Sequence, residues 1–118
     1  MTRTHEIVPG LPEGDACPCG ASVEQALQIL EGRWKASVLA RLSANPTLRF
    51  SELRRAIATV SPKMLTEQLR ELERDGLVRR TVFPEVPPRV EYALTADGHA
   101  LIPALRALRE WADTRSHR

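Results

Sequence analysis

The sequence of 118 residues lacks any apolar run close to the roughly 20 residues that a membrane-spanning helix needs. Its first 20 residues also lack the basic start and the apolar stretch of a secretory signal peptide. We therefore expect a cytoplasmic protein with no membrane partner. The length allows one domain with a single core, and 42% hydrophobic and 27% charged residues are ordinary for a globular chain.

Cysteine and histidine are scarce. The two cysteines, Cys17 and Cys19 in a Cys-Pro-Cys sequence, are too few for a disulfide scaffold, and no second pair follows that could complete a four-cysteine zinc site. The three histidines, His5, His99 and His117, stand at no metal-binding spacing from the cysteines. We therefore expect no metal, no cofactor and no catalytic residue. A thiol enzyme built on Cys-Pro-Cys would lack a base at any recognisable spacing.

A strong excess of one charge is also missing, because the net charge is only +2. The distribution is uneven, however: residues 49–89 hold nine of the 17 Lys and Arg but six of the 15 Asp and Glu. A local excess of basic residues is typical of a face that meets phosphates. It amounts to three charges, so an ordinary solvated surface remains the alternative. The low aromatic content of 4% offers no platform on which bases could stack.

The most strongly marked element is a helix between Ser61 and Gly76. Ser61 can cap the free N–H groups, Pro62 suits the first helical position, and Gly76 can adopt the left-handed turn that ends a helix. Leucines recur at helical spacing between these ends: Leu65, Leu69 and Leu72. The opposite face is polar and mixed in charge, which suits a helix in the major groove of DNA. An ordinary amphipathic surface helix has the same pattern, so the interpretation depends on the neighbouring elements.

The elements on either side of this helix predict a fold of the α+β class that is mostly helical. The predicted elements are helices at 22–31, 34–43 and 51–57, a short strand at 49–50, the helix at 61–76, strands at 77–83 and 89–94, and a last helix at 96–114. Ser51 is expected to cap the third helix and Thr95 the last. Three prolines between the two longer strands indicate a stiff, projecting loop. Pro103 inside the last helix predicts a kink or a break.

This order is that of a winged helix-turn-helix domain. Residues 51–76 would form the helix-turn-helix, 77–94 the wing and 95–114 the C-terminal helix. We expect residues 1–20 to form a flexible arm and 21–115 to form the domain.

Several short sequences carry a family resemblance. They are GRWK at 32–35, RFSELR at 49–54, SPKMLT at 61–66, LRELE at 69–73, DGLV at 75–78, PEVPPRVEY at 84–92 and LT at 94–95. In order and spacing, about residues 22–112 resemble the HxlR-type transcriptional regulators, small bacterial winged-helix proteins distantly similar to the MarR regulators. The resemblance implies a homodimer in which the first and last helices pack against their counterparts.

Both end helices carry more apolar residues than a small core requires. The candidate dimer contacts are Val23, Leu27, Leu101, Leu105, Leu108 and Trp111. The alternative is that these side chains only cover the core of their own domain. Trp34 lies on the apolar stripe of its helix and is expected in the core, whereas Lys35 is expected to be solvated.

The helix at 61–76 provides the candidate contacts to double-stranded DNA. Arginine can bind guanine through two hydrogen bonds, glutamate can accept one from cytosine, and a threonine methyl can contact that of thymine. The candidates for base edges are Lys63, Thr66, Glu67 and Arg70. Ser61 and Gln68 are expected to hold phosphate oxygens near the helix start. For Glu67, an ion pair with Arg70 or Lys63 is an equally good interpretation.

Three arginines of the wing are further candidates. Arg79, Arg80 and Arg89 are expected to contact phosphates or the minor groove beside the helix. For Arg79 and Arg80 the alternative is ordinary strand-surface charge, with Arg80 paired to Glu91. Arg89 lies at the base of the loop, which favours a role in binding.

The cysteines leave two interpretations. Some members of the resembling family carry a cysteine near the start of the first helix that senses oxidants or electrophiles, at about Gly20 or Ala21 here. Cys17 and Cys19 lie slightly upstream of that place. A bridge within Cys-Pro-Cys would be strained, so an oxidised form would link two chains. The other interpretation is a pair of inert thiols.

Together these patterns predict a sequence-specific, DNA-binding transcriptional regulator rather than an enzyme. As a homodimer it would read an inverted repeat with half-sites about one helical turn apart. Modulation by thiol oxidation or by a small ligand is compatible with the sequence. The alternative is a winged helix that contacts only proteins, a class that often loses the basic residues retained here as Arg70 and Arg89.

Overall fold

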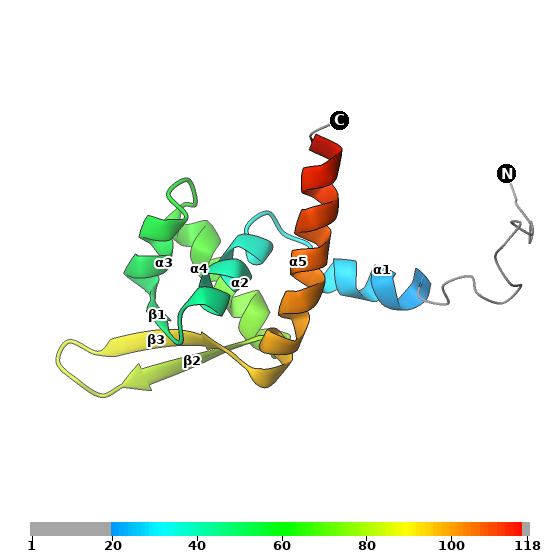
Figure 1. The fold of residues 1–118 in the computed structure, drawn as a ribbon. Coiled ribbons are helices and arrows are strands. Elements are labelled where there is room, and N and C mark those ends of the chain that lie inside the picture. The colour runs from blue at the N-terminus through cyan, green and yellow to red at the C-terminus, as the bar shows by residue number, and fades with distance from the viewer. Residues whose placement is uncertain (1–19, 117–118) are drawn as a thin grey trace, which may run out of the picture.

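The computed structural model describes residues 20–116 of the chain. Its elements in order are α1 (Gly20–Ile29), α2 (Lys35–Ala44), β1 (Leu48–Arg49), α3 (Phe50–Ala56), α4 (Pro62–Arg74), β2 (Val78–Phe83), β3 (Arg89–Leu94) and α5 (Ala96–Ser116). Figure 1 shows α2, α3 and α4 gathered over a small sheet whose long hairpin projects to one side. The predicted order of elements and the mostly helical α+β class are both confirmed.

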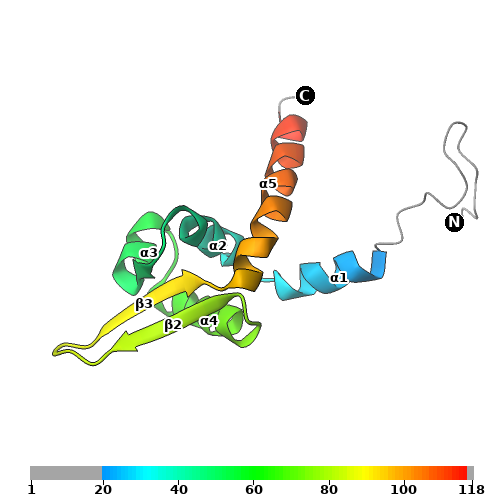
Figure 2. The same cartoon turned by 60° about the horizontal axis from the view of Figure 1, so that its bottom comes forward.

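The sheet has three antiparallel strands in the order β1-β3-β2. The hairpin is paired from Val78 opposite Leu94 to Phe83 opposite Arg89, so all six residues of each strand take part. The proline-rich loop at 84–88 therefore lies at the far tip of the hairpin, beyond the body of the domain (Figure 2).

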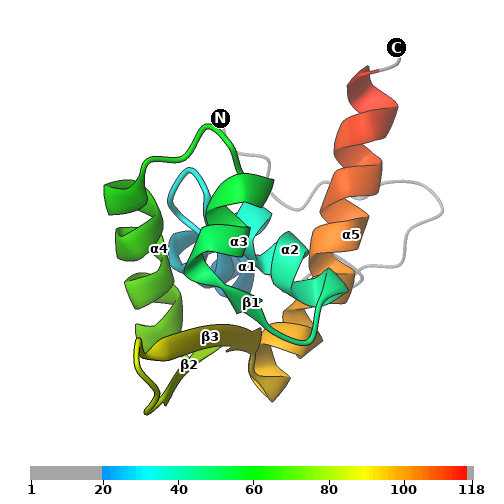
Figure 3. The same ribbon diagram turned by 90° about the vertical axis from the view of Figure 1, so that its left-hand side faces the viewer.

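The core forms where α2, α3 and α4 meet the sheet (Figure 3). The predicted leucine stripe of α4 is its centre, since Leu65, Leu69 and Leu72 are at most 1% exposed. Burying each leucine stabilises the fold by roughly 1.5–3 kcal/mol. Val38 and Leu39 of α2 are fully buried in the same cluster. The core thus fixes which face of α4 remains outside.

Two predicted caps are present. The Ser61 hydroxyl accepts a hydrogen bond of 3.0 Å from the Met64 N–H at the start of α4. The Thr95 hydroxyl accepts one of 3.0 Å from the Gly98 N–H and donates one of 2.6 Å to the Gly76 carbonyl. Thr95 therefore ties the start of α5 to the end of α4.

The predicted start of α3 is wrong by two residues. The helix begins at Phe50 rather than after a cap at Ser51. Glu52 is the reason, because its carboxylate accepts a hydrogen bond of 2.8 Å from the Arg49 N–H and closes the first turn there.

Of the kink or break predicted at Pro103, the break is not found. The helix α5 runs without interruption from Ala96 to Ser116 across Pro103. Proline removes only one backbone donor, and here its side chain is exposed. Next to it Ile102 is buried, and Leu101 and Leu105 pack against the core, so tertiary contacts hold the helix on both sides of Pro103.

The first helix behaves differently from the others. None of the ten residues of α1 is buried, and the helix projects from the rest of the domain (Figure 1). It begins at Gly20, two residues before the predicted start of the helix at 22–31. No helix within residues 20–116 is long and apolar enough to cross a membrane.

Candidate nucleic-acid interface

The two sides of α4 differ sharply in character. Its core side is closed by leucines, whereas Lys63, Glu67 and Arg70 are exposed on the other side. Within residues 20–116, none of these three side chains forms an ion pair. The predicted pairing of Glu67 with Arg70 or Lys63 is therefore not found there. The exposed face of α4 offers both donors and an acceptor to a partner.

Thr66 lies at the edge of this face and has only part of its side chain available. Its hydroxyl donates a hydrogen bond of 2.9 Å to the Pro62 carbonyl. The methyl group is then the part that a neighbouring molecule can contact, which suits the predicted contact with a thymine methyl.

The helix and the wing share a hollow. Thr66 and Arg70 of α4 line it together with Arg80 of β2, and its volume is about 430 Å³. Tyr92, 8% exposed, lies on the neighbouring strand and also lines it. Two arginines from different elements, Arg70 and Arg80, thus border one concave surface together with a single acidic residue, Glu73.

Arg79 lies apart from this hollow. Successive side chains of a strand point to opposite faces of the sheet, so the exposed Arg79 and Arg80 face opposite ways. The predicted ion pair of Arg80 with Glu91 is not found within residues 20–116 either, because Arg80 lies opposite Tyr92 in the register and its side chain faces away from Glu91, which binds Arg89.

Gln68 is only 6% exposed and belongs to the buried side of α4, a position that does not favour the predicted contact with a phosphate. Its Nε2 atom donates a weak hydrogen bond of 3.6 Å to the Met64 sulfur, and its Oε1 atom has no partner in the described part of the chain. At 100° per residue, Gln68 falls about 40° beyond Leu72, at the edge of the leucine side, which the helical pattern could have revealed.

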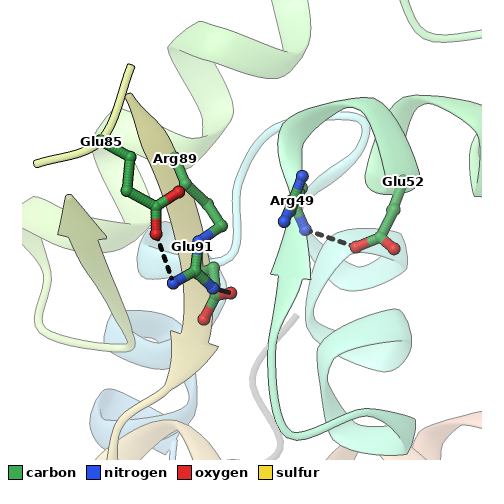
Figure 4. A network of polar contacts seen from close by, with 5 residues as sticks. All are labelled: Arg49, Glu52, Glu85, Arg89 and Glu91. Atoms are coloured by element: carbon green, nitrogen blue, oxygen red, sulfur yellow. Dashed lines mark hydrogen bonds and ion pairs between the residues drawn. The ribbon is translucent and has the colours of Figure 1, made fainter. Parts of the chain in front are cut away.

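Arg89 occupies a closed network at the base of the wing loop (Figure 4). Its guanidinium donates to Glu85 at 3.1 Å and to Glu91 at 2.6 Å, and it lies 3.9 Å over the ring of Phe83. The hydrogen bond with Glu85 raises the pKa of Arg89 further above its already high value. Two carboxylates thus surround one cation, so the wing base is not a free positive charge.

A second polar cluster was missed entirely by sequence reasoning. Lys35, expected in solvent, is 3% exposed. Its Nζ atom lies 2.5 Å from a carboxylate oxygen of Glu71 on α4 and 3.4 Å from the carbonyl of Ile29 at the end of α1. The hydrogen bond from Lys35 lowers the pKa of Glu71 below its ordinary value. A lone lysine at the start of a helix gave no signal of this burial.

The predicted dimer residues divide into two groups. Val23 and Leu27 of α1 and Leu108 and Trp111 of α5 are 46–62% exposed. Leu101 and Leu105 instead pack against the domain core, as their alternative interpretation predicted.

Cys17 and Cys19 lie outside the described residues. Within 20–116, no group of three His, Cys, Asp or Glu side chains could hold a metal ion.

Comparison with known proteins places this geometry in a family. The profile of the HxlR-like helix-turn-helix family matches residues 29–118. An HTH-type transcriptional regulator of Methanothermobacter thermautotrophicus is 53% identical over 90 residues, which are 76% of this chain and 68% of that protein.

Solved structures show the same likeness. The redox regulator HypR in its oxidized form is 41% identical with a TM-score of 0.72, over 79% of this chain and 95% of its own. The reduced form of the transcriptional regulator YodB from Bacillus subtilis is 38% identical with a TM-score of 0.70, over 82% and 91%.

Proposed function

This chain belongs to the HxlR-like helix-turn-helix family, and from that premise we propose that it binds an inverted-repeat DNA operator as a homodimer. It is a helix-turn-helix transcriptional regulator. The observation that carries the proposal is the exposed face of α4, where Lys63, Glu67 and Arg70 are unpaired within residues 20–116 and the opposite face is fixed in the core.

In this proposal α4 enters the major groove. Arg70 and Lys63 would donate to base acceptors, of which guanine offers two, and the Thr66 methyl would contact thymine. Glu67 would be repelled by phosphates, so its place on this face suits a base donor such as the cytosine amino group.

The remaining contacts would fix the position on the duplex. Ser61, exposed at the start of α4, lies where backbone N–H groups attract a phosphate. Arg80 would reach the phosphates beside the groove from the hollow that it shares with α4. Arg79 faces the other side of the sheet and would add only long-range attraction. Gln68 has no part in the proposal.

The homodimer is supported by apolar side chains that this domain leaves uncovered. Val23, Leu27, Leu108 and Trp111 are all at least 46% exposed. A second copy that buried them would bring together two α4 helices related by a twofold axis, which is the symmetry of an inverted repeat.

We further propose that thiol oxidation modulates this regulator. The support is the Cys17 and Cys19 pair just before α1, together with the likeness to a redox regulator. Each interchain disulfide would join two thiolates and pass two electrons to an oxidant such as diamide. Non-reducing gels of wild type and a Cys17→Ser/Cys19→Ser variant test it: a diamide-induced covalent dimer is expected only for wild type. Identical gels for the two proteins would contradict it.

The function is tested by selecting an operator from random-sequence DNA and titrating it by fluorescence anisotropy. Replacing Arg70 by Ala is expected to remove about 1–3 kcal/mol of discrimination at one base position of each half-site. Arg80→Ala should weaken binding to all sequences and reduce the slope against salt by about one.

Arg106→Ala, an exposed arginine of α5, is the matched control and should change neither quantity. If wild type selected no sequence and bound with no dependence on salt, the protein-contact alternative would replace the proposal.

A further inference from the structure

The buried Lys35 contacts two helices for which we propose different functions, α1 in dimerisation and α4 in DNA binding. Lys35 is the first residue of α2, and it contacts Ile29, the last residue of α1, and Glu71 on the flank of α4. These contacts connect the helix with an exposed apolar face to the helix with the exposed polar face. No other ion pair within residues 20–116 joins two different helices.

The position of Lys35 is unfavourable for its own helix. A cation at a helix N-terminus opposes the helix dipole, and a buried cation loses its hydration. Both costs are offset by the neighbours rather than by α2: the C-terminal end of α1 attracts a cation, and Glu71 neutralises it. Lys35 therefore stabilises the position of α1 relative to α4.

The surroundings of Lys35 leave room for α1 to move relative to α4. A cavity of about 750 Å³ lies between the end of α1 and α4, lined among others by Gln28, Gly32 and Glu71. The unpartnered Oε1 atom of Gln68 lies against Gly32, where a Cβ would stand 2.4 Å from it and 3.4 Å from Cε of Lys35. Because no residue of α1 is buried, apolar packing neither fixes α1 in place nor fills this cavity.

We propose that Lys35 is a positioning residue that sets the angle between the dimer helix α1 and the recognition helix α4. The inference rests on the proposed homodimer. In it, the angle of each α4 to α1 decides how far apart, and in what relative rotation, the two recognition helices meet DNA. The Lys35–Glu71 pair then selects the spacing between half-sites without touching a base.

The first test needs no DNA. Glu71→Gln keeps the size of the side chain and weakens the link to Lys35, so amide hydrogen exchange at Leu30 and Glu31, the two residues that follow α1, should become faster. Glu73→Gln makes the same change on the same helix, where the carboxylate has no ion pair within residues 20–116, and should leave that exchange unchanged. Unchanged exchange in Glu71→Gln would overturn the inference.

The second test measures spacing on the selected operator. One base pair inserted between the half-sites rotates them by about 35° relative to each other. Wild type should discriminate strongly against the insertion. The double variant Lys35→Met/Glu71→Gln, which leaves no unpaired buried charge, should keep its affinity for a single half-site and lose about tenfold of the discrimination.

The outcomes separate the two proposals. If the double variant bound the half-site and both operators more weakly by the same factor, the Lys35–Glu71 pair would only stabilise the fold. If it discriminated against the inserted base pair as strongly as wild type, the spacing would be set elsewhere. Either result overturns the inference. Failure of wild type to select any operator would contradict the proposed function, while the exchange experiment would still decide whether the link exists.

Discussion

Gly32 illustrates how much a single residue controls at the junction of α1 and α2. Its φ angle is +133°, a conformation that other residues adopt at a cost of order 1–3 kcal/mol. A Cβ there would also stand 2.4 Å from Gln68 Oε1. Gly32→Ala should therefore lower the free energy of unfolding in urea by about 2 kcal/mol or more. The control is Gly20→Ala, which meets nothing within 4 Å, and an equal loss in both variants would contradict the argument.

Glu71 predicts a pH-dependent stability. Its pKa in the folded protein is lowered from 4.5, chiefly by the hydrogen bond with Lys35, so the unfolded chain takes up this proton first as the pH falls. The stabilisation is complete above pH 4.5 and is lost as the pH falls through the lowered value. Urea unfolding should show wild type more stable than Glu71→Gln at pH 7, with the difference shrinking below pH 4. A difference independent of pH would show that the carboxylate charge is not responsible.

Single residues also show what a sequence can reveal. The buried leucines of α4 follow from period alone, because Leu65, Leu69 and Leu72 share one face. The same period places Gln68 on that face, but a polar side chain there is easily assigned to solvent. The burial of Lys35 depends on Glu71, 36 residues away, and no local pattern carries that information.

At the scale of elements, Ser61 at the N-terminus of α4 has two roles, since it caps the helix and is proposed to bind a phosphate. Its hydroxyl caps the helix, so Ser61→Ala should cost about 1 kcal/mol of stability. Ser61→Asp keeps a capping oxygen and adds a negative charge where a phosphate is proposed to bind. It should retain the stability of wild type in thermal unfolding and lose DNA affinity. If Ser61→Asp bound DNA as tightly as wild type, no phosphate would lie near this cap.

The wing gives a second prediction at this scale. Removing Arg89 leaves the carboxylates of Glu85 and Glu91 without their cation, so Arg89→Ala should weaken DNA binding through added repulsion. Arg89→Ala/Glu85→Gln should recover much of the affinity at low salt, because it restores the charge balance. If the double variant remained as weak as Arg89→Ala, the guanidinium itself would contact DNA.

Element order was predictable because each boundary has a local signal, such as the Ser61-Pro62 start of α4 and Thr95 before α5. The misplaced boundaries arise where contacts decide between local alternatives. Glu52 closes the first turn of α3 two residues early, and core packing carries α5 across Pro103. Strand alternation alone puts Glu91 on the same face as Arg89, two residues along β3, whereas the hairpin register is needed to bring Phe83 opposite Arg89.

For the whole molecule, the exposed apolar residues of α1 and α5 predict self-association. Leu27→Lys/Trp111→Lys would place charges in the proposed dimer interface. Sedimentation should show wild type as a dimer and this variant as a folded monomer with lower affinity for the full operator. Val86→Lys, which changes a fully exposed residue of the wing tip, is the control and should stay dimeric. A dimeric double variant would place the interface elsewhere.

The burial of Lys35 has a consequence for the chemical reactivity of the protein. The chain has two lysines, and the second, Lys63, is exposed at the first turn of α4. With Lys35 enclosed beside Glu71, an acylating reagent meets one accessible lysine side chain, and that side chain belongs to the proposed DNA-reading face. Among lysine side chains, acetylation of the native protein would thus modify the one on this face almost selectively, and protection of Lys63 from labelling would report DNA occupancy.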